Sequence, residues 1–406
     1  MAEITRTIAR SGETALRSDV KAAATAVRKE RMFYIDNLRL VMIVFVILLH
    51  TAVTYSGLGS WYYKEAGKLD PVSFTVFGLS MTFTQGYFMG ILFLIAGYFV
   101  PGAYDRKGFG KFVKDRLVRL GIPVLLYMLV IHPFIIYFIM GLPWASVKPA
   151  FLDFYTGYVT SLDFVGSSGP LWFALALLIF SIVYALYRLA AASRKPAPAA
   201  KVKVTSARLV GLTLAIALLA FLLRLVQPLG TSILNMQIGF FSQYLILFPV
   251  GILAYRQGWF SKIETALGMT WLRLGLIASP ILWMVVMVGG GALDRGFDPF
   301  IGGMHWQALA FALWESFTAV AMSVGLITLF REKYNRQNGL VKILSDNSFA
   351  AYVFHAPVLI SISLLLQPLA MYPLAKFLFV GPLAVIATFA LTFLVLRRVP
   401  LLKKVI

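Results

Sequence analysis

The sequence contains no cysteine, few charged residues and especially few acids. The lack of cysteine excludes disulfides, thiolate metal sites and cysteine nucleophiles. Only 13% of the 406 residues are charged, about half the share that is usual in soluble domains. Because 60% of the residues are also hydrophobic, the composition excludes an ordinary water-soluble protein.

Long uncharged stretches recur along almost the whole chain. About 20 apolar residues in a helix cross the ~30 Å hydrocarbon core of a bilayer. We therefore predict an all-α membrane protein with about ten transmembrane helices, at residues 38–57, 74–100, 118–141, 171–189, 209–226, 238–255, 271–290, 306–330, 349–366 and 374–396. Around this membrane body, residues 34–400, we expect a polar basic tail at 1–33 and a short tail at 401–406. The first tail lacks the apolar run of a secretory signal.

The basic residues divide unevenly between the two sides of the predicted membrane. Alternate loops and the two tails hold 31 of the 37 lysines and arginines, and the opposite side holds 6. Basic loops stay in the cytoplasm, so both termini are predicted to be cytoplasmic. The net charge of +20 is spread over helix ends and short loops, without a basic stripe interleaved with aromatics. This pattern favours anionic membrane lipids as partners and argues against nucleic acid.

Ionisable side chains within the predicted spans are few, and each is costly in hydrocarbon, so each suggests a function. Three of the four histidines, His50, His132 and His355, fall within spans, and Glu315 is the one acid deep in a span. We expect His132 to fill the backbone gap left by the adjacent Pro133. Glu315 has three interpretations: catalysis together with His50, a structural hydrogen bond, or ion coupling in transport.

The first span places a cation and an imidazole on one helical face. Arg39 and His50 are eleven residues apart, three turns plus only 20°, and ~16 Å along the axis. Arg39 would lie at the cytoplasmic surface, where it could hold a phosphate or carboxylate, and His50 near mid-membrane, where it could accept a proton. Asp36 is placed to pair with Arg39. A snorkelling arginine and a structural histidine are the alternative.

Two further groups face the predicted cytoplasmic side. Arg116 and Arg119 share one helical face and could clamp a phosphate, or they could simply set the topology. His355 could line a tunnel for the same ligand or make a structural hydrogen bond. On the opposite side, the widest loop carries aromatics and acids that could bind a sugar or anchor the protein at the interface: Trp144, Asp153, Tyr155, Tyr158 and Asp163.

Five segments in order resemble the acyltransferase-3 family of integral-membrane enzymes. They are YIDNLRLVMIVFVILLHTAV at 34–53, FLIAGYF at 93–99, KGFGKFVKDRLVRLGIP at 107–123, GPLWFALALL at 169–178 and SFAAYVFHAPVL at 348–359. The sequence departs from the family pattern at Ala96, where a serine is usual. The D-x-x-R start and the LWF segment resemble the glucan succinyltransferase branch.

The resemblance implies a multi-pass enzyme of the bacterial inner membrane that moves an acyl group, acetyl or succinyl, from cytoplasmic acyl-CoA to a hydroxyl of an extracytoplasmic glycan. It implies that His50 is catalytic and that Arg39, Arg116 and Arg119 bind the donor. We assign His355 to donor binding as well, Glu315 to catalysis, and Trp172 and Asp36 to substrate binding. No metal is expected, and a homo-oligomer is compatible with the sequence.

Two rival functions remain at this point. A proton-coupled transporter would use His50, His132 and Glu315 as a relay, but it calls for inverted repeats, which the sequence does not display. A membrane scaffold would leave the intramembrane histidines without a role. Since we see no appended hydrolase-like domain before Ile406, we expect the membrane body to pass the acyl group to the acceptor itself.

Overall fold

A computed structural model of the protein describes residues 31–65, 67, 69–142, 148–191, 202–395 and 398. Predictions about most of the 1–33 tail, about the 401–406 tail and about Trp144 lie outside these residues. The chain divides into two units, Met1–Phe33 and Tyr34–Ile406. Only the second, which carries every predicted site residue, is discussed below.

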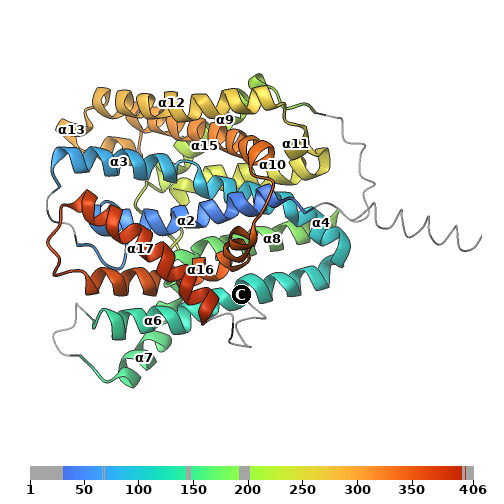
Figure 1. Cartoon of the computed structure of the whole chain (residues 1–406). Coiled ribbons are helices and arrows are strands. Elements are labelled where there is room, and N and C mark those ends of the chain that lie inside the picture. Colours follow the sequence, from blue (N-terminus) through green and yellow to red (C-terminus); the bar gives the residue numbers. More distant parts are fainter. Residues whose placement is uncertain are drawn as a thin grey trace, which may run out of the picture. The chain divides into compact units, whose positions relative to one another are not determined.

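The described part of this unit consists of helices without strands, as predicted (Figure 1). In chain order they are α2 (Phe33–Ser56), α3 (Pro71–Gln85), α4 (Phe88–Arg116), η1 (Leu117–Gly121), α5 (Ile122–Leu126), η2 (Tyr127–Ile131), α6 (His132–Phe134), η3 (Ile135–Ile139), α7 (Phe151–Thr160), η4 (Asp163–Gly166), η5 (Gly169–Leu171), α8 (Trp172–Ala190), α9 (Ser206–Val226), η6 (Ile238–Phe240), α10 (Phe241–Gln257), α11 (Trp259–Lys262), α12 (Thr265–Gly289), α13 (Ala292–Arg295), α14 (Asp298–Ile301), α15 (Trp306–Lys333), α16 (Gly339–Leu365) and α17 (Pro373–Leu394).

Nine helical runs in the described residues are long and apolar enough to cross a membrane. One of them, Pro71–Ile139, contains 69 residues and covers two of the ten predicted spans, 74–100 and 118–141. Gly108 interrupts it with a φ of 69°, and Figure 1 shows the chain turning back beyond α4. A left-handed φ suits glycine, which lacks the Cβ that would clash. The multi-helix membrane architecture is thus confirmed, and the difference in number comes from this one run.

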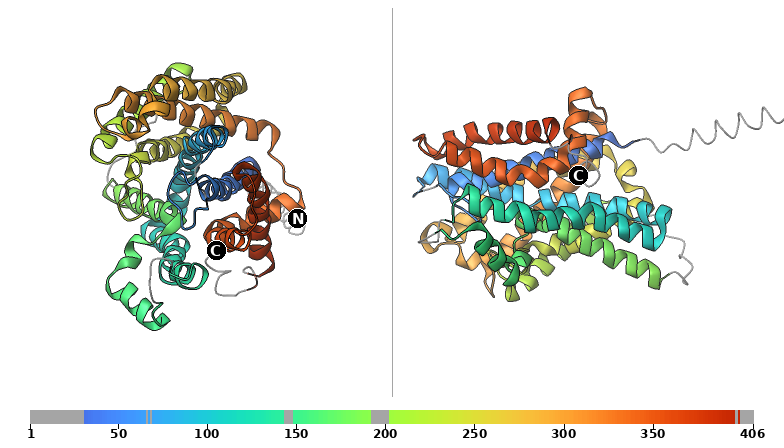
Figure 2. Two further views of the ribbon diagram at one scale, coloured as in Figure 1. Left: turned by 90° about the vertical axis from the view of Figure 1, so that its left-hand side faces the viewer. Right: turned by 90° about the horizontal axis from the view of Figure 1, so that it is seen from below.

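Helix α2 lies inside the bundle, between the α3–α4 segment and α17 (Figure 2, left). Buried residues occur on all its faces, which agrees with its nearly uncharged sequence. Near its start, the amide of Asn37 donates to the carbonyl oxygens of Tyr334 and Arg336, at 2.6 and 2.9 Å. These bonds tie α2 to the α15–α16 connection, so its register within the bundle is defined.

Helices α4 and α10 pack backbone to backbone at two glycines. A Cβ on Gly97 would lie 2.1 Å from the Phe248 carbonyl oxygen, and one on Gly251 would lie 2.1 Å from that of Leu94. Small residues at a crossing let membrane helices approach in this way. The pair forms a tightly packed wall, and α4 presents its other side to α2.

The helix through Pro133 is braced by two tyrosines of α7, the next helix along the chain. Pro133 has no N–H, so carbonyls one turn earlier lose their usual donor. The hydroxyl of Tyr155 donates to the Leu129 carbonyl at 3.1 Å, and that of Tyr158 to the Met128 carbonyl at 2.7 Å. The prediction that His132 fills this gap is therefore wrong. Tyr155 and Tyr158 do so, because α7 folds back against the helix.

Candidate active site

One face of α2 lines two neighbouring cavities. Arg39 and Ile43 line the first, of about 280 Å³, and Val46 and His50 line the second, of about 220 Å³. These four positions fall at i, i+4, i+7 and i+11, which is one stripe of an α-helix. Arg39 and His50 thus share a face, as the spacing predicts. Tyr352 of α16 lines both cavities and so belongs to the wall between them.

The arginine cavity, which is the one lined by Arg39, also contains Arg116 and Arg119. Arg39 and Arg119 are exposed, and Arg116 is half-buried. Asp115 lies 3.2 Å from the Arg119 guanidinium and so neutralises part of the charge. Ala96, where the family usually has serine, lines the same cavity. Three guanidinium groups around one cavity suit a ligand with several phosphates.

The histidine cavity, which is the one lined by His50, has mixed walls. Ser60, Gln85, Asn235 and Gln237 provide hydroxyl and amide groups, and Trp172 provides an aromatic face. Hydroxyl-rich ligands are held by such a combination of hydrogen-bonding groups and ring faces. The position of Trp172 is therefore compatible with the predicted role in substrate binding.

His50 is hydrogen-bonded to a second histidine. Its Nδ1 lies 3.0 Å from Nε2 of His355, and Nδ1 of His355 lies 2.6 Å from the Tyr352 carbonyl oxygen. A carbonyl only accepts, so Nδ1 of His355 must donate, and in a neutral ring its Nε2 must then accept. His50 consequently donates from Nδ1. When both rings are neutral, Nε2 of His50 keeps its lone pair.

The loop between α2 and α3 covers this pair. The indole of Trp61 stacks on the His50 ring, with centroids 3.9 Å apart and planes 14° apart. The hydroxyl of Tyr62 lies 2.8 Å from Nδ1 of His132 and 3.0 Å from the Tyr127 hydroxyl. Burial raises the pKa of Tyr62, which keeps its hydroxyl protonated. Neither loop residue was predicted from the sequence, because only the fold brings this loop back over the span.

Glu315 pairs with Arg224 of α9. The Arg224 guanidinium donates to the carboxylate, and its Nε donates to the Gly239 carbonyl at 3.0 Å. Both side chains are buried, at 0% and 2% exposure. In the described part of the chain, no hydrogen bond links Glu315 to His50. The arrangement supports the structural interpretation of Glu315, and the catalytic assignment stays a prediction.

Two other predicted residues lie apart from the cavities. His355 is fully buried against His50 and does not line the arginine cavity, although it follows Tyr352 by one turn. Asp36 precedes Arg39 by one turn and lines neither cavity. Their assignments to donor and substrate binding remain predictions.

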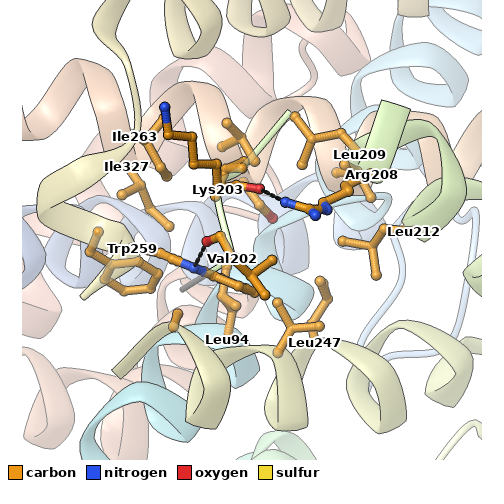
Figure 3. A pocket seen from close by; sticks show the side chains of 17 residues that line it. Leu94, Val202, Lys203, Arg208, Leu209, Leu212, Leu247, Trp259, Ile263 and Ile327 are labelled. Carbon is orange, nitrogen blue, oxygen red and sulfur yellow. Dashed lines mark hydrogen bonds between the residues drawn. The ribbon is translucent and has the colours of Figure 1, made fainter. Parts of the chain in front are cut away.

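Two further cavities lie among the described residues. The aromatic cavity, of about 330 Å³, is lined by Trp283, Phe300, Phe311 and Glu315 among others, and it shares Gln85, Gln237 and Phe240 with the histidine cavity. The Trp259 cavity (Figure 3), of about 170 Å³, is almost wholly apolar. There Trp259 donates to the Val202 carbonyl at 2.8 Å. It shares no lining residue with the other three cavities and contains no predicted site residue.

Comparison with known proteins decides the family. A family model described as an acyltransferase domain matches residues 32–397, which is most of the chain. The chain belongs to the acyltransferase-3 family. The enzyme is therefore a membrane acyltransferase that transfers groups other than aminoacyl groups. Searches of curated proteins and of solved structures gave no match. The two cavities on α2 are the candidate active site of this acyltransferase.

The Glu315–Arg224 pair gives a first prediction. We expect Glu315→Ala to lower the free energy of unfolding by ~3–5 kcal/mol, because it leaves a buried guanidinium unpaired. The double variant Arg224→Met, Glu315→Leu should regain most of this loss. Thermal unfolding of the purified variants measures both effects. A double variant no more stable than the single one would contradict the structural role, and a stable but inactive double variant would uphold catalysis by Glu315.

Proposed function

We propose that the enzyme is an O-acyltransferase that carries an acyl group from cytoplasmic acyl-CoA to a hydroxyl of an extracytoplasmic glycan, in a bacterial inner membrane. The observation that carries the proposal is the stripe of α2, from Arg39 in one cavity to His50 in the next, with Tyr352 between them. Basic loops near Arg39 favour the cytoplasm for that end.

Acyl-CoA matches this layout from end to end. Its phosphates suit the guanidinium groups of Arg39, Arg116 and Arg119, which can bind them bidentately. Between phosphates and thioester lies the pantetheine arm, whose reach is comparable to the ~16 Å between Arg39 and His50 along the helix. The thioester carbon would then lie near the imidazole, beyond the Tyr352 wall.

The chemistry needs one base, and His50 has the required lone pair. In direct transfer, Nε2 takes the proton of the acceptor hydroxyl as its oxygen attacks the thioester carbonyl. The C–S bond then breaks, and the CoA thiolate takes the proton from Nε2. The products are an ester and CoA. In the alternative route, Nε2 attacks the carbonyl itself and the C–S bond breaks, which expels the CoA thiolate. The acceptor hydroxyl then attacks the acyl-imidazole, its proton passes to the thiolate, and the products are again an ester and CoA. His355 is a positioning residue in both routes.

The acceptor suits the histidine cavity. The hydroxyl and amide groups of Ser60, Asn235 and Gln237 and the ring of Trp172 surround a space next to His50. A sugar offers hydroxyls to the polar groups and a C–H face to the indole. The extracytoplasmic side is favoured because the loops that contribute here belong to the weakly basic side of the predicted topology.

Replacement of His50 tests the base. We expect His50→Ala to lower the transfer rate ~10²–10⁴-fold, the range typical for loss of a general acid–base group. His305→Ala is the matched control, since His305 is exposed and lines none of the four cavities. Mass spectrometry of envelope glycans from cells with each variant measures the acyl mass added. A folded His50→Ala protein that still acylates would reject the assignment.

Replacement of His355 tests the hydrogen bond to His50. Glutamine can accept from Nδ1 of His50 through its amide oxygen, whereas leucine cannot. We expect His355→Leu to lower kcat ~10–100-fold, as for other partners that orient a functional imidazole. His355→Gln should lose much less and keep the wild-type pH profile. If kcat falls equally in both variants and their pH profiles are unchanged, His355 contributes only packing.

Replacement of the arginines tests the donor site. We expect Arg39→Gln or Arg116→Gln to raise KM for acyl-CoA ~10-fold or more, because each removes a charge-assisted hydrogen bond to phosphate. Lys114→Gln is the control, since Lys114 is an exposed cation on α4 that does not line the cavity. Steady-state kinetics with the purified enzyme give KM. If the two arginine variants have the same KM for acyl-CoA as the Lys114→Gln control, the cavity does not bind the donor.

A further inference from the structure

The aromatic cavity lies against the same turn of α2 as the histidine cavity. Leu49 and Val53, the neighbours of His50 at i−1 and i+3, line the aromatic cavity. Gln85, Gln237 and Phe240 line both spaces. The two cavities therefore adjoin along these three side chains, and a group at His50 would reach the aromatic cavity by passing between them.

The two cavities differ in what they can hold. The histidine cavity offers hydroxyl and amide groups, whereas rings and aliphatic side chains dominate the aromatic cavity, with Trp283, Phe300 and Phe311 among them. Apolar surface favours an apolar ligand, at a gain that grows with each methylene buried. Acyl transfer brings two groups to His50, which are the hydroxyl-bearing acceptor and the acyl group of the donor.

The order of groups within acyl-CoA indicates which of the two groups enters the aromatic cavity. If the phosphates lie at Arg39 and the thioester at His50, the acyl chain is the part that extends beyond His50. We propose that the aromatic cavity binds the acyl chain of the donor, and that the enzyme uses uncharged apolar acyl groups longer than acetyl. This inference rests on the proposed function and narrows its acyl group.

Charge argues against the succinyl group suggested by the sequence resemblance. The one charged side chain that lines the cavity within the described residues is Glu315, a carboxylate already paired with Arg224. A second carboxylate beside it would be desolvated and repelled. An aliphatic chain meets neither penalty. The same apolar chemistry could come from a lipid chain on the acceptor, so the experiment must separate the two sources.

Binding of S-alkyl-CoA thioethers to the full-length protein in lipid nanodiscs tests the inference without an acceptor. Ethyl, butyl and hexyl thioethers differ only in the chain, and we expect affinity to rise about fourfold for each added methylene. Succinate-like carboxyethyl-CoA should bind no better than ethyl-CoA. Empty nanodiscs, measured in parallel, correct for partition of the chain into lipid.

Two variants fill the cavity. Gly78→Leu adds a side chain where a Cβ would meet Trp283 at an ordinary 3.5 Å. Thr82→Leu replaces a residue whose hydroxyl donates to carbonyl oxygens of its own helix. Both residues line the cavity. We expect either variant to bind ethyl-CoA as the wild type does and to lose the gain with hexyl-CoA. Gly211→Leu, on an exposed helical face with open space at the Cβ, is the matched control.

The possible outcomes separate the hypotheses. Chain-length dependence that disappears in Gly78→Leu and Thr82→Leu but not in Gly211→Leu supports the inference. Thioethers that all bind with one affinity overturn it and leave the proposed function standing, whereas a protein that binds no CoA derivative overturns the proposed function. Hexyl glucoside that competes with hexyl-CoA and is acylated faster than methyl glucoside would assign the cavity to a lipid-linked acceptor instead.

Discussion

The hydrogen bond between His50 and His355 is the contact on which the whole site depends. It joins α2 to α16 across 305 residues of sequence. His355 is in turn held by the Tyr352 carbonyl, and the Tyr352 hydroxyl donates to the carbonyl of Pro170. Polar groups in a bilayer-embedded interior must find partners within the protein. This chain of bonds therefore defines the position and the protonated nitrogen of the His50 imidazole.

Helix α4 lines the same two cavities from the side opposite α2. On α4, Phe88 and Met89 line the histidine cavity, whereas Leu92, Ile95 and Ala96 line the arginine cavity. On its other side α4 packs against α10 through the glycine contacts described above. Both cavities thus share one closely packed wall formed by α4 and backed by α10.

Features that depend on one helix were predictable from the sequence. The spans follow from length and hydropathy, and the common face of Arg39 and His50 follows from 3.6 residues per turn. The grouping of Arg116 and Arg119 with Arg39 could be expected only from the family resemblance. The spans and the common face each depend on a spacing within one stretch of chain.

Features that depend on where helices cross were not predictable. The partner of Glu315 is Arg224, 91 residues away in the sequence and on another helix. The partner of His50 is another histidine, and its cover is Trp61 from a loop without any motif. The contacts of Tyr155 and Tyr158 with the helix at Pro133 likewise depend on how the helices pack. A single sequence does not show which residues from distant segments come into contact.

The Tyr352 wall also has an electrical consequence. If water fills the arginine cavity from one side and the histidine cavity from the other, the membrane potential falls mainly across this thin partition. Moving one elementary charge across 100 mV takes about 2.3 kcal/mol. The phosphates of a nucleotide would have to remain on their own side, while a neutral group could pass without electrical work. Tyr352 would thus separate the charged phosphates of the donor from the uncharged group that is transferred.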